Sequence, residues 1–362
     1  MKILFLANHF ITLYSFRKEL ISDLCKKGYE VYLSIPQDDN NYFQKLGCKI
    51  INTKIDRRGV NPVKDIGLIK QYVKIMSTIK PDIIFSYTIK PNIYGSMVSN
   101  LLKYRQICNI TGTGGTFLNK SIISELIKIL YKFSVKKCYK VFFQNNGDKD
   151  YFVENKMVGK NWETIPGSGC NIEDHTYIEM PSDEITQFIF IGRVMELKGI
   201  DEYLDCAKTI REKNQNTRFL VAGWNEEKKY KEILEKYEAD GYIEYIGFRN
   251  DINDWIAKSH CTILPSHGGE GVPNVLLETS AIGRACIGSK INGTSEVISD
   301  GITGYLFETG NAEDLIKQVD KFLHLSYEQK SVMGIEGRKR IESKFNRQIV
   351  IDKYLDEVNA IK

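Results

Sequence analysis

The first half of the chain alternates short apolar runs with longer segments in which apolar residues recur at helical spacing. Short apolar runs bounded by polar residues are typical of buried strands, and repeats of three or four residues are typical of amphipathic helices. The expected strands are residues 2–7, 30–35, 49–53, 82–87, 106–110 and 140–144. The expected helices are residues 16–26, 62–79, 92–102 and 121–138. This alternation predicts a parallel, doubly wound sheet.

The pattern changes after residue 166. Residues 167–184 are rich in Gly, Ser, Asn, Pro and acidic residues, which is typical of a linker. The alternation then resumes, with expected strands at 188–194, 218–222, 243–248, 261–264 and 285–288, and expected helices at 201–213, 226–238, 251–258, 274–282 and 312–323. We therefore expect two α/β domains, residues 1–166 and 185–345, followed by a helix within residues 346–362.

The most informative stretch is residues 264–284, LPSHGGEGVPNVLLETSAIGR, which follows an apolar strand pattern. Gly268, Gly269 and Gly271 predict a flexible turn. Pro273 stands where a helix would begin, a position that tolerates its missing N–H. A glycine loop that leads into a helix N-terminus offers free backbone N–H groups and a partial positive charge to an anion.

Two carboxylates bracket this loop, Glu270 before the helix and Glu278 inside it. With the surrounding Pro-Ser, Glu-Gly-x-Pro and Leu-Leu-Glu, this spacing resembles the Glu-x7-Glu signature of family 4 retaining glycosyltransferases. These enzymes have the GT-B fold, in which two Rossmann-like domains with doubly wound parallel sheets face a central cleft. The resemblance implies that Glu278 holds the ribose of a nucleotide sugar and that Glu270 lies near the sugar. It also implies that the helix N-terminus, with Gly271, Asn274 and Val275, faces the diphosphate.

A second loop, residues 191–199, resembles the Gly-Arg…Lys-Gly loop of the same family. Glycosyl transfer expels a diphosphate, and Arg193 and Lys198 can neutralise the charge that builds on it. Together with Glu270 they are the expected catalytic residues; the alternative is two exposed basic residues in a turn. The family's counterpart of the turn Gly247-Phe248-Arg249 lies beside the nucleobase, although a plain turn at a strand end fits equally well.

Loops of the first half supply candidates for contact with the acceptor or its diphosphate. Gly112, Thr113, Gly114 and Gly115 follow an expected strand and precede an expected helix. Their N–H groups can meet a phosphate, and a purely structural turn is the alternative. Relatives carry a Gly-Leu-Gly-like loop at this place, which implies that it faces the donor diphosphate and the acceptor.

Two further turns in the first half supply four candidate residues. Many relatives have a histidine near Ile89 that orients the donor sugar; this chain has none there, and Thr88 and Lys90 are its substitutes. His9 and Tyr14, in the turn expected after the first strand, can border the acceptor, and packing is the alternative for His9.

Arg57 and Arg58 resemble a loop of relatives that extend polyprenyl-diphosphate-linked sugars. Two adjacent arginines can meet an acceptor diphosphate, and a solvated charged turn is the alternative.

Composition narrows the choice of protein class. The chain has 362 residues, 42% of them hydrophobic and 27% charged, which is ordinary for a soluble globular protein. No apolar run reaches the roughly 18–20 residues that a transmembrane helix needs. The eight cysteines include no Cys-x-x-Cys pair, so we expect no metal or redox centre.

Charge is distributed unevenly along the chain. Residues 1–180 hold 26 Lys and Arg against 16 Asp and Glu, a net charge of +10, and residues 181–362 hold 24 against 30, a net charge of −6. This asymmetry arises either by chance or because the first half meets an anionic partner such as a membrane or a lipid diphosphate.

Residues 120–140 carry six lysines and one acid, Glu125. Lys128, Lys132 and Lys136 recur every four residues beside an apolar stripe of Ile123, Leu126, Ile127 and Leu130. Basic residues beside an apolar face are what a helix lying on a membrane surface needs. The alternative is an ordinary amphipathic helix packed on the sheet.

The resemblance implies a retaining, metal-independent hexosyltransferase with a UDP-sugar donor and no cofactor. Its acceptor would be a lipid-linked saccharide, as in bacterial enzymes that add an N-acetylhexosamine such as α1,3-GalNAc to undecaprenyl-diphosphate sugars. We expect a cytoplasmic enzyme on the inner face of the plasma membrane, with no nucleic-acid partner, in capsule, O-antigen or other glycan assembly. The alternatives are a GT-B nucleotide-sugar epimerase and a non-catalytic GT-B-like scaffold.

Overall fold

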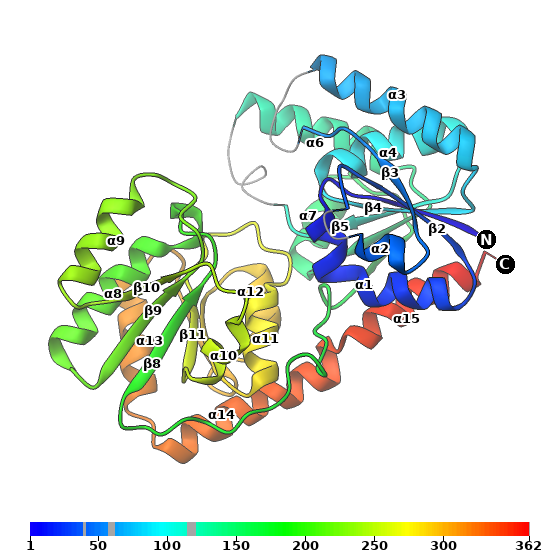
Figure 1. Ribbon diagram of the computed structural model, residues 1–362. Coiled ribbons are helices and arrows are strands. Elements are labelled where there is room, and N and C mark those ends of the chain that lie inside the picture. Colours follow the sequence, from blue (N-terminus) through cyan, green and yellow to red (C-terminus); the bar gives the residue numbers. More distant parts are fainter. Residues whose placement is uncertain (39–40, 57–61, 114–120, 362) are drawn as a thin grey trace. The chain divides into compact units, whose positions relative to one another are not determined.

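The computed structural model describes residues 1–38, 41–56, 62–113 and 121–361 (Figure 1). The chain divides into two compact units. Unit 1 contains residues 1–168 and 349–362, and unit 2 contains residues 169–348. The first division falls within the stretch of Gly, Ser and Pro residues that follows residue 166. Among the described helices, none is both long and apolar enough to cross a bilayer.

Unit 1 is built on a parallel sheet of seven strands in the order β3-β2-β1-β4-β5-β6-β7. The strands are β1 (Lys2–Leu6), β2 (Glu30–Ile35), β3 (Lys49–Asn52), β4 (Ile83–Tyr87), β5 (Gln106–Ile110), β6 (Lys140–Phe143) and β7 (Trp162–Thr164). The helices are α1 (Phe10–Lys26), α2 (Tyr42–Lys45), α3 (Pro62–Ile79), α4 (Ile89–Leu102), α6 (Ile122–Val135), α7 (Asn146–Glu154) and α15 (Arg347–Asn359).

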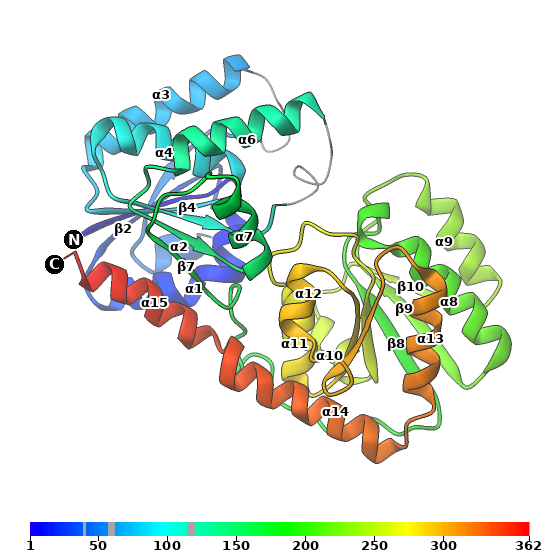
Figure 2. The ribbon, with the colours of Figure 1, turned by 180° about the vertical axis from the view of Figure 1, so that it is seen from behind.

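Alternate residues of β1 bury opposite faces of this sheet. Ile3 and Phe5 belong to a hydrophobic cluster with α1 and α15, whereas Leu4 and Leu6 belong to a cluster with α3 and α4. The remaining helices of the second face, α6 and α7, pack over β5 and β6. Figure 2 shows the same unit from behind, with α15 running beside α1.

Unit 2 repeats the arrangement with six parallel strands in the order β10-β9-β8-β11-β12-β13. The strands are β8 (Thr186–Ile191), β9 (Thr217–Ala222), β10 (Glu244–Gly247), β11 (Cys261–Leu264), β12 (Ala285–Ser289) and β13 (Gly304–Phe307). The helices are α8 (Ile200–Lys213), α9 (Tyr230–Ala239), α10 (Ile252–Ala257), α11 (Asn274–Ile282), α12 (Asn292–Val297), α13 (Ala312–Leu323) and α14 (Tyr327–Arg340), with short turns η1 (Glu196–Lys198) and η2 (Ile341–Phe345). Two parallel sheets with interleaved helices confirm the predicted fold class.

Several predicted boundaries were wrong. Helix α1 begins at Phe10, not residue 16, because His9 caps it: its Nδ1 accepts a hydrogen bond of 3.1 Å from the Ile11 N–H. The expected turn around Tyr14 is therefore helical. Helix α4 likewise begins at Ile89, three residues early. The pattern also missed the short elements α2, α7, β7, α12 and β13.

Helix α15 is fixed to unit 1 by a buried aromatic residue. The Tyr354 ring contacts Phe85 and Phe142, with centroids 5.1 and 5.2 Å away, and its hydroxyl donates a hydrogen bond to Asn109 Oδ1. The buried Arg17 guanidinium lies over the rings of Tyr354 and Tyr87 at 5.4 and 5.0 Å. Residues 349–362 are thus part of the unit 1 core although they end the chain.

We predict that Tyr354→Phe loosens α15 without unfolding unit 1. The substitution leaves the Asn109 oxygen buried without this donor, which typically costs about 1–3 kcal/mol. Amide hydrogen exchange in α15 should speed up by roughly 5- to 150-fold, because such a cost shifts the opening equilibrium by that factor. Tyr177→Phe, at a half-exposed tyrosine, is the control. Unchanged exchange in α15 would contradict the prediction.

Candidate functional site

In unit 2, two loops beyond the carboxyl edge of the sheet meet backbone to backbone. The loop after β8 carries Arg193 and Lys198 and ends at Gly199, whose φ is +71°. A Cβ at Gly199 would overlap the carbonyl oxygen of Pro265, which belongs to the loop after β11. The glycine therefore lets the two loops lie in contact.

Opposite charges meet where these loops touch. The Lys198 ammonium contacts the Glu270 carboxylate, and both side chains are largely buried. Glu270 also accepts a hydrogen bond of 2.9 Å from Ser266 Oγ. The carbonyl of Ser266 in turn accepts a hydrogen bond from Ser289 Oγ, at the end of β12. Two of the expected catalytic residues are therefore held together.

The expected glycine turn feeds α11, as the pattern predicts. Pro273 is its N-cap, and its side chain offers no acceptor to the first turn. A Cβ at Gly293, in α12, would overlap the carbonyl oxygen of Gly271, so α12 supports the turn from behind. Asn274 and Val275, both partly exposed, begin the helix. A helix start of this kind favours an anion.

Glu278 lies one turn beyond Asn274 on α11 and is partly exposed. Burial of its carboxyl raises its pKa above the ordinary value, and the positive charges of His175 and Arg347 offset part of that rise. A carboxylate that is costly to keep charged in the ligand-free protein suits hydrogen bonding to hydroxyl donors.

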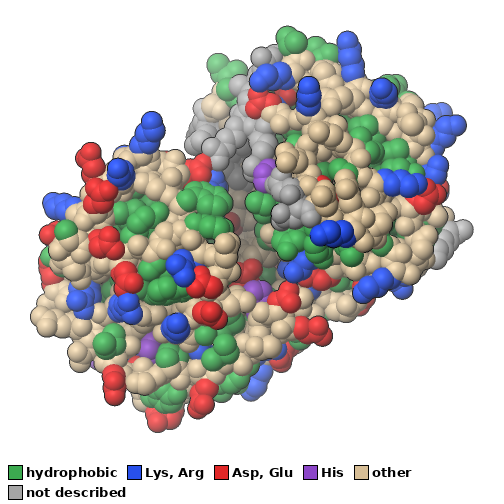
Figure 3. Space-filling view, viewed as in Figure 1, with side chains coloured by type: hydrophobic (Ala, Val, Ile, Leu, Met, Phe, Trp, Pro, Cys, Tyr) green, Lys and Arg blue, Asp and Glu red, His purple; other side chains and the backbone are tan. Residues whose placement is uncertain are grey.

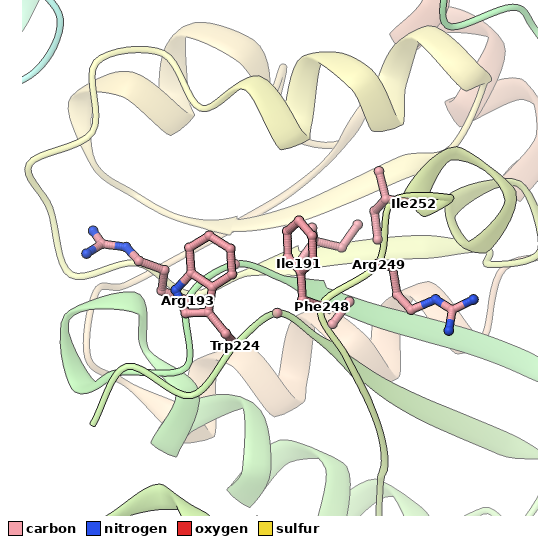
Figure 4. A pocket seen from close by; sticks show the side chains of 9 residues that line it. Ile191, Arg193, Trp224, Phe248, Arg249 and Ile252 are labelled. Carbon is pink, nitrogen blue, oxygen red and sulfur yellow. The ribbon is translucent and has the colours of Figure 1, made fainter. Parts of the chain in front are cut away.

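A cavity of about 280 Å³ lies beyond β8, β9 and β10 (Figure 4). Trp224 and Phe248 flank it with ring centroids 4.9 Å apart, and Ile191 and Ile252 extend its apolar wall. A Cβ at Gly223 would overlap the Gly192 carbonyl oxygen, so the floor is also backbone against backbone. Because Trp224 and Phe248 contact each other, a flat ring can lie against this apolar wall, not between the two rings.

The two arginines that line this cavity differ in their surroundings. Figure 4 shows both guanidinium groups pointing away from the cavity, to opposite sides. Arg249 forms two hydrogen bonds to Asp251, at 2.8 and 2.7 Å. The Arg193 guanidinium lies 3.9 Å from the Glu226 carboxylate, and its side chain is partly exposed on the same loop as Lys198. Arg193 is thus better placed than Arg249 to meet a ligand phosphate.

Comparisons with known families agree with this geometry. A model described as "Glycosyl transferase 4-like" matches residues 2–145, and one described as "Glycosyl transferases group 1" matches residues 178–340. Each model matches less than half of the chain and together they match most of it, so this chain is a glycosyltransferase. It is therefore an enzyme of glycosyl transfer, and the resemblance to family 4 is confirmed.

Relatives of this glycosyltransferase cover nearly its full length. It is 26% identical, over 98% of its own chain and 97% of the relative, to the N,N'-diacetylbacillosaminyl-diphospho-undecaprenol alpha-1,3-N-acetylgalactosaminyltransferase of Campylobacter jejuni. It is 24% identical, over 83% of its chain and 80% of the relative, to the UDP-Gal:alpha-D-GlcNAc-diphosphoundecaprenol alpha-1,3-galactosyltransferase of Escherichia coli. The crystal structure of Anabaena HepE in complex with UDP-glucose has the same fold, with a TM-score of 0.80, 14% identity and 99% of each chain covered.

The candidate residues of unit 1 have different surroundings in the structure of this glycosyltransferase. Tyr14 stacks on Phe10 inside α1, with ring centroids 5.1 Å apart, so packing accounts for it. Lys90 forms an ion pair of 2.6 Å with Asp65, and both side chains are largely buried. Thr88 has a φ of +71°, unusual for a residue with a Cβ.

The loop after β5 is partly described. Gly112 has a φ of +109°, and Thr113 Oγ1 donates a 3.4 Å hydrogen bond to Asp148, a nearly buried carboxyl whose pKa is raised by that burial. Asp148 is therefore an internal residue of α7. Gly114, Gly115, Arg57 and Arg58 lie outside the described residues.

The sequence did not indicate a second link between the loop that carries Lys198 and the loop that carries Glu270. His267 Nε2 lies 2.8 Å from Oε1 of Glu202, a residue at the start of α8. The backbone N–H of His267 donates a hydrogen bond of 2.9 Å to the Leu197 carbonyl. This pair holds the Lys198 loop to the Glu270 loop from the other side. Only the proximity of His267 to Glu270 in the sequence signalled it.

We predict that Glu278→Gln stabilises the ligand-free enzyme at neutral pH. The folded-state pKa of Glu278 is raised, so the stability linked to its protonation is present at low pH and lost as pH rises through the folded pKa. The thermal midpoint of the variant should exceed that of the wild type at pH 7 to 8, and the two should converge below about pH 4. Glu313→Gln, on the exposed start of α13, should show no such difference.

Proposed function

We propose that this enzyme is a retaining, metal-independent hexosyltransferase. It moves a sugar, an N-acetylhexosamine, from a UDP-sugar to a polyprenyl-diphosphate-linked saccharide in bacterial surface polysaccharide or glycan assembly. The observation that carries this proposal is the meeting of Lys198, Glu270 and the start of α11 beside the cavity that Arg193 lines.

In this proposal, three sets of residues bind three parts of the donor: the uracil, the ribose and the diphosphate. The uracil ring lies in the cavity against the wall that Trp224 and Phe248 form together, because an apolar aromatic wall suits the face of a flat ring, and the turn that begins at Gly247 brings Phe248 to this wall. Glu278 accepts hydrogen bonds from the ribose hydroxyls. The diphosphate meets Arg193, Lys198 and the N–H groups at the start of α11, which together supply positive charge where negative charge develops.

Transfer then requires no protein nucleophile. The acceptor oxygen bonds to the anomeric carbon as the bond from that carbon to the diphosphate oxygen breaks, and the acceptor proton passes to the departing diphosphate. Attack and departure on the same face of the sugar retain the configuration. Lys198 holds the leaving group, and Glu270, which Lys198 contacts in the ligand-free enzyme, becomes available to the sugar hydroxyls.

The acceptor proposal draws on the relatives, whose names specify undecaprenol diphosphate. Such an acceptor is anchored in a bilayer, so we place the enzyme at the cytoplasmic face of the plasma membrane, bound peripherally. Within unit 1, the loops at His9, Thr88 and Gly112–Thr113 all follow strands at the carboxyl edge of the sheet, the edge where ligands bind in such sheets.

The test of this function is a transfer assay with a panel of UDP-sugars and a short-chain polyprenyl-diphosphate N-acetylhexosamine. We expect one UDP-N-acetylhexosamine to release UDP only with the acceptor, and NMR to show an α linkage. Lys198→Ala should lower kcat by about 10²- to 10³-fold, the typical loss for one preorganised charge partner. Excess EDTA should leave the rate unchanged.

Two outcomes of that assay would contradict the proposal. Free or epimerised sugar formed without acceptor would favour the epimerase alternative. Full inhibition by EDTA with rescue by Mg²⁺ would show that a metal ion is needed at the diphosphate. Lys290→Ala, at an exposed lysine beyond β12, is the matched control for Lys198→Ala.

We also predict that Glu278→Ala weakens donor binding. Loss of charged hydrogen bonds typically costs about 1.5–3 kcal/mol, which corresponds to roughly a 10- to 150-fold rise in the Kd for the UDP-sugar. Titration calorimetry on the folded variant measures this directly. Equal affinity in variant and wild type would show that Glu278 does not hold the ribose.

A further inference from the structure

Helix α6 carries a continuous row of exposed apolar side chains. Ile122, Leu126, Ile129 and Phe133 recur at spacings of four, three and four residues, so they lie along one side of the helix, and we call them the α6 stripe. Ile122 is 91% exposed, Phe133 is 73% exposed, and the other two are about half exposed. Soluble surfaces rarely expose contiguous apolar rows of this kind without a partner.

The opposite side of α6 already anchors the helix to unit 1. Tyr131 and Val135 are buried in the cluster over β5 and β6, and Ile127 and Leu130 pack against the same cluster. Ser124 and Ser134 are buried on this side as well. The α6 stripe therefore adds nothing to the core of unit 1.

This arrangement differs from the stripe that the sequence predicted. Of the four apolar residues expected there, Ile127 and Leu130 pack against the core, while Leu126 and the half-exposed Ile123 face outward. Lys128 forms an ion pair of 2.7 Å with Glu125 and is mostly covered. The expected membrane-facing lysine at this position is thus engaged within the helix.

Positive charge accompanies the α6 stripe at its C-terminal end. Lys132, Lys136 and Lys137 are exposed in and just after the last turn of α6, and the one acid of the helix, Glu125, is paired with Lys128. Figure 3 shows more Lys and Arg than Asp and Glu over unit 1 on the face it presents. The charge around the stripe is therefore complementary to an anionic surface.

We infer that α6 docks the enzyme on an anionic bilayer by inserting the α6 stripe into the headgroup region, with the three lysines beside it at the phosphates. An apolar row flanked by lysines is the chemistry of a helix that lies in a membrane interface. The inference rests on the proposed function, because an acceptor with a polyprenyl chain is itself held in a bilayer. It assigns the anchoring to apolar insertion, with lysines in a supporting role.

The position of the stripe within unit 1 agrees with this role. Helix α6 follows β5, so Ile122 lies at the carboxyl edge of the sheet, the edge that also carries Thr113. From there the α6 stripe runs back along the helix for about 16 Å, given a rise of about 1.5 Å per residue. Val63 and Ile66, in the first turns of α3, are exposed apolar residues at the same edge. Membrane contact would therefore begin beside the acceptor candidates of unit 1.

Vesicle flotation tests the inference with the full-length enzyme. The double variant I129S/F133S should lower partition onto vesicles of phosphatidylcholine with phosphatidylglycerol by at least about tenfold, because two large apolar side chains no longer enter the bilayer. The matched control, I302S/V332S, removes two half-exposed apolar side chains from unit 2 and should change partition less than about twofold. High salt should release only part of the wild type, since screening leaves apolar insertion intact.

The triple variant K132E/K136E/K137E separates the lysines from the stripe. It should lose binding to anionic vesicles and keep the weak binding of the wild type to pure phosphatidylcholine. Equal flotation of I129S/F133S and wild type would overturn the inference. So would a wild-type dimer, measured by light scattering, that I129S/F133S dissociates while vesicle binding persists, because the stripe would then join two copies of the chain.

Transfer to a short-chain, water-soluble acceptor distinguishes this failure from failure of the proposed function. Stripe-dependent flotation without any transfer would leave the docking surface standing and remove the proposed reaction. Transfer together with flotation that does not depend on the α6 stripe would support the proposed reaction and remove the docking surface.

Discussion

Parallel strand pairing is the constraint on which the arrangement of this glycosyltransferase depends. The strand pairs of both sheets run parallel, so each strand returns through a crossover before the next one begins. All the loops that follow strands consequently gather at one edge of their sheet. Lys198 and Glu270 are 72 residues apart and yet in contact for this reason. The same geometry brings Trp224 and Phe248 into contact in the wall of one cavity.

The alternation of strands and helices was sufficient to predict the fold, because buried parallel strands are continuous apolar runs that a helix pattern does not imitate. The residues at which helices begin were harder to predict. His9 is an unusual cap. Apolar residues surround Tyr14 on several sides of the helix, so no single apolar face marks the first turns of α1 in the sequence. Short elements such as α2 and β13 have too few residues to show a period.

The loops of the candidate site could be located from glycines and charges that follow strands, whereas the partners of each residue could not. Nothing in the spacing relates Trp224 to Phe248 or Glu202 to His267, because each pair is assembled from two separate crossovers. The prediction of which side of α6 faces solvent failed for a different reason. Apolar residues occupy both of its sides, and burial of Tyr131 against the sheet, invisible in the sequence, decides which side faces solvent.

The glycines of unit 2 have a consequence for altering donor preference. At Gly199, Gly223 and Gly293 a side chain would overlap a neighbouring carbonyl oxygen. A single substitution at any of these glycines would therefore push two backbone segments apart. In this chain, the positions that can change are therefore those whose side chains border the cavity without supporting it. The half-exposed Trp224 and Phe248 are such positions. If the proposed donor site is right, a library confined to them would sample new nucleotide preferences while the loops that carry the charges stay in register.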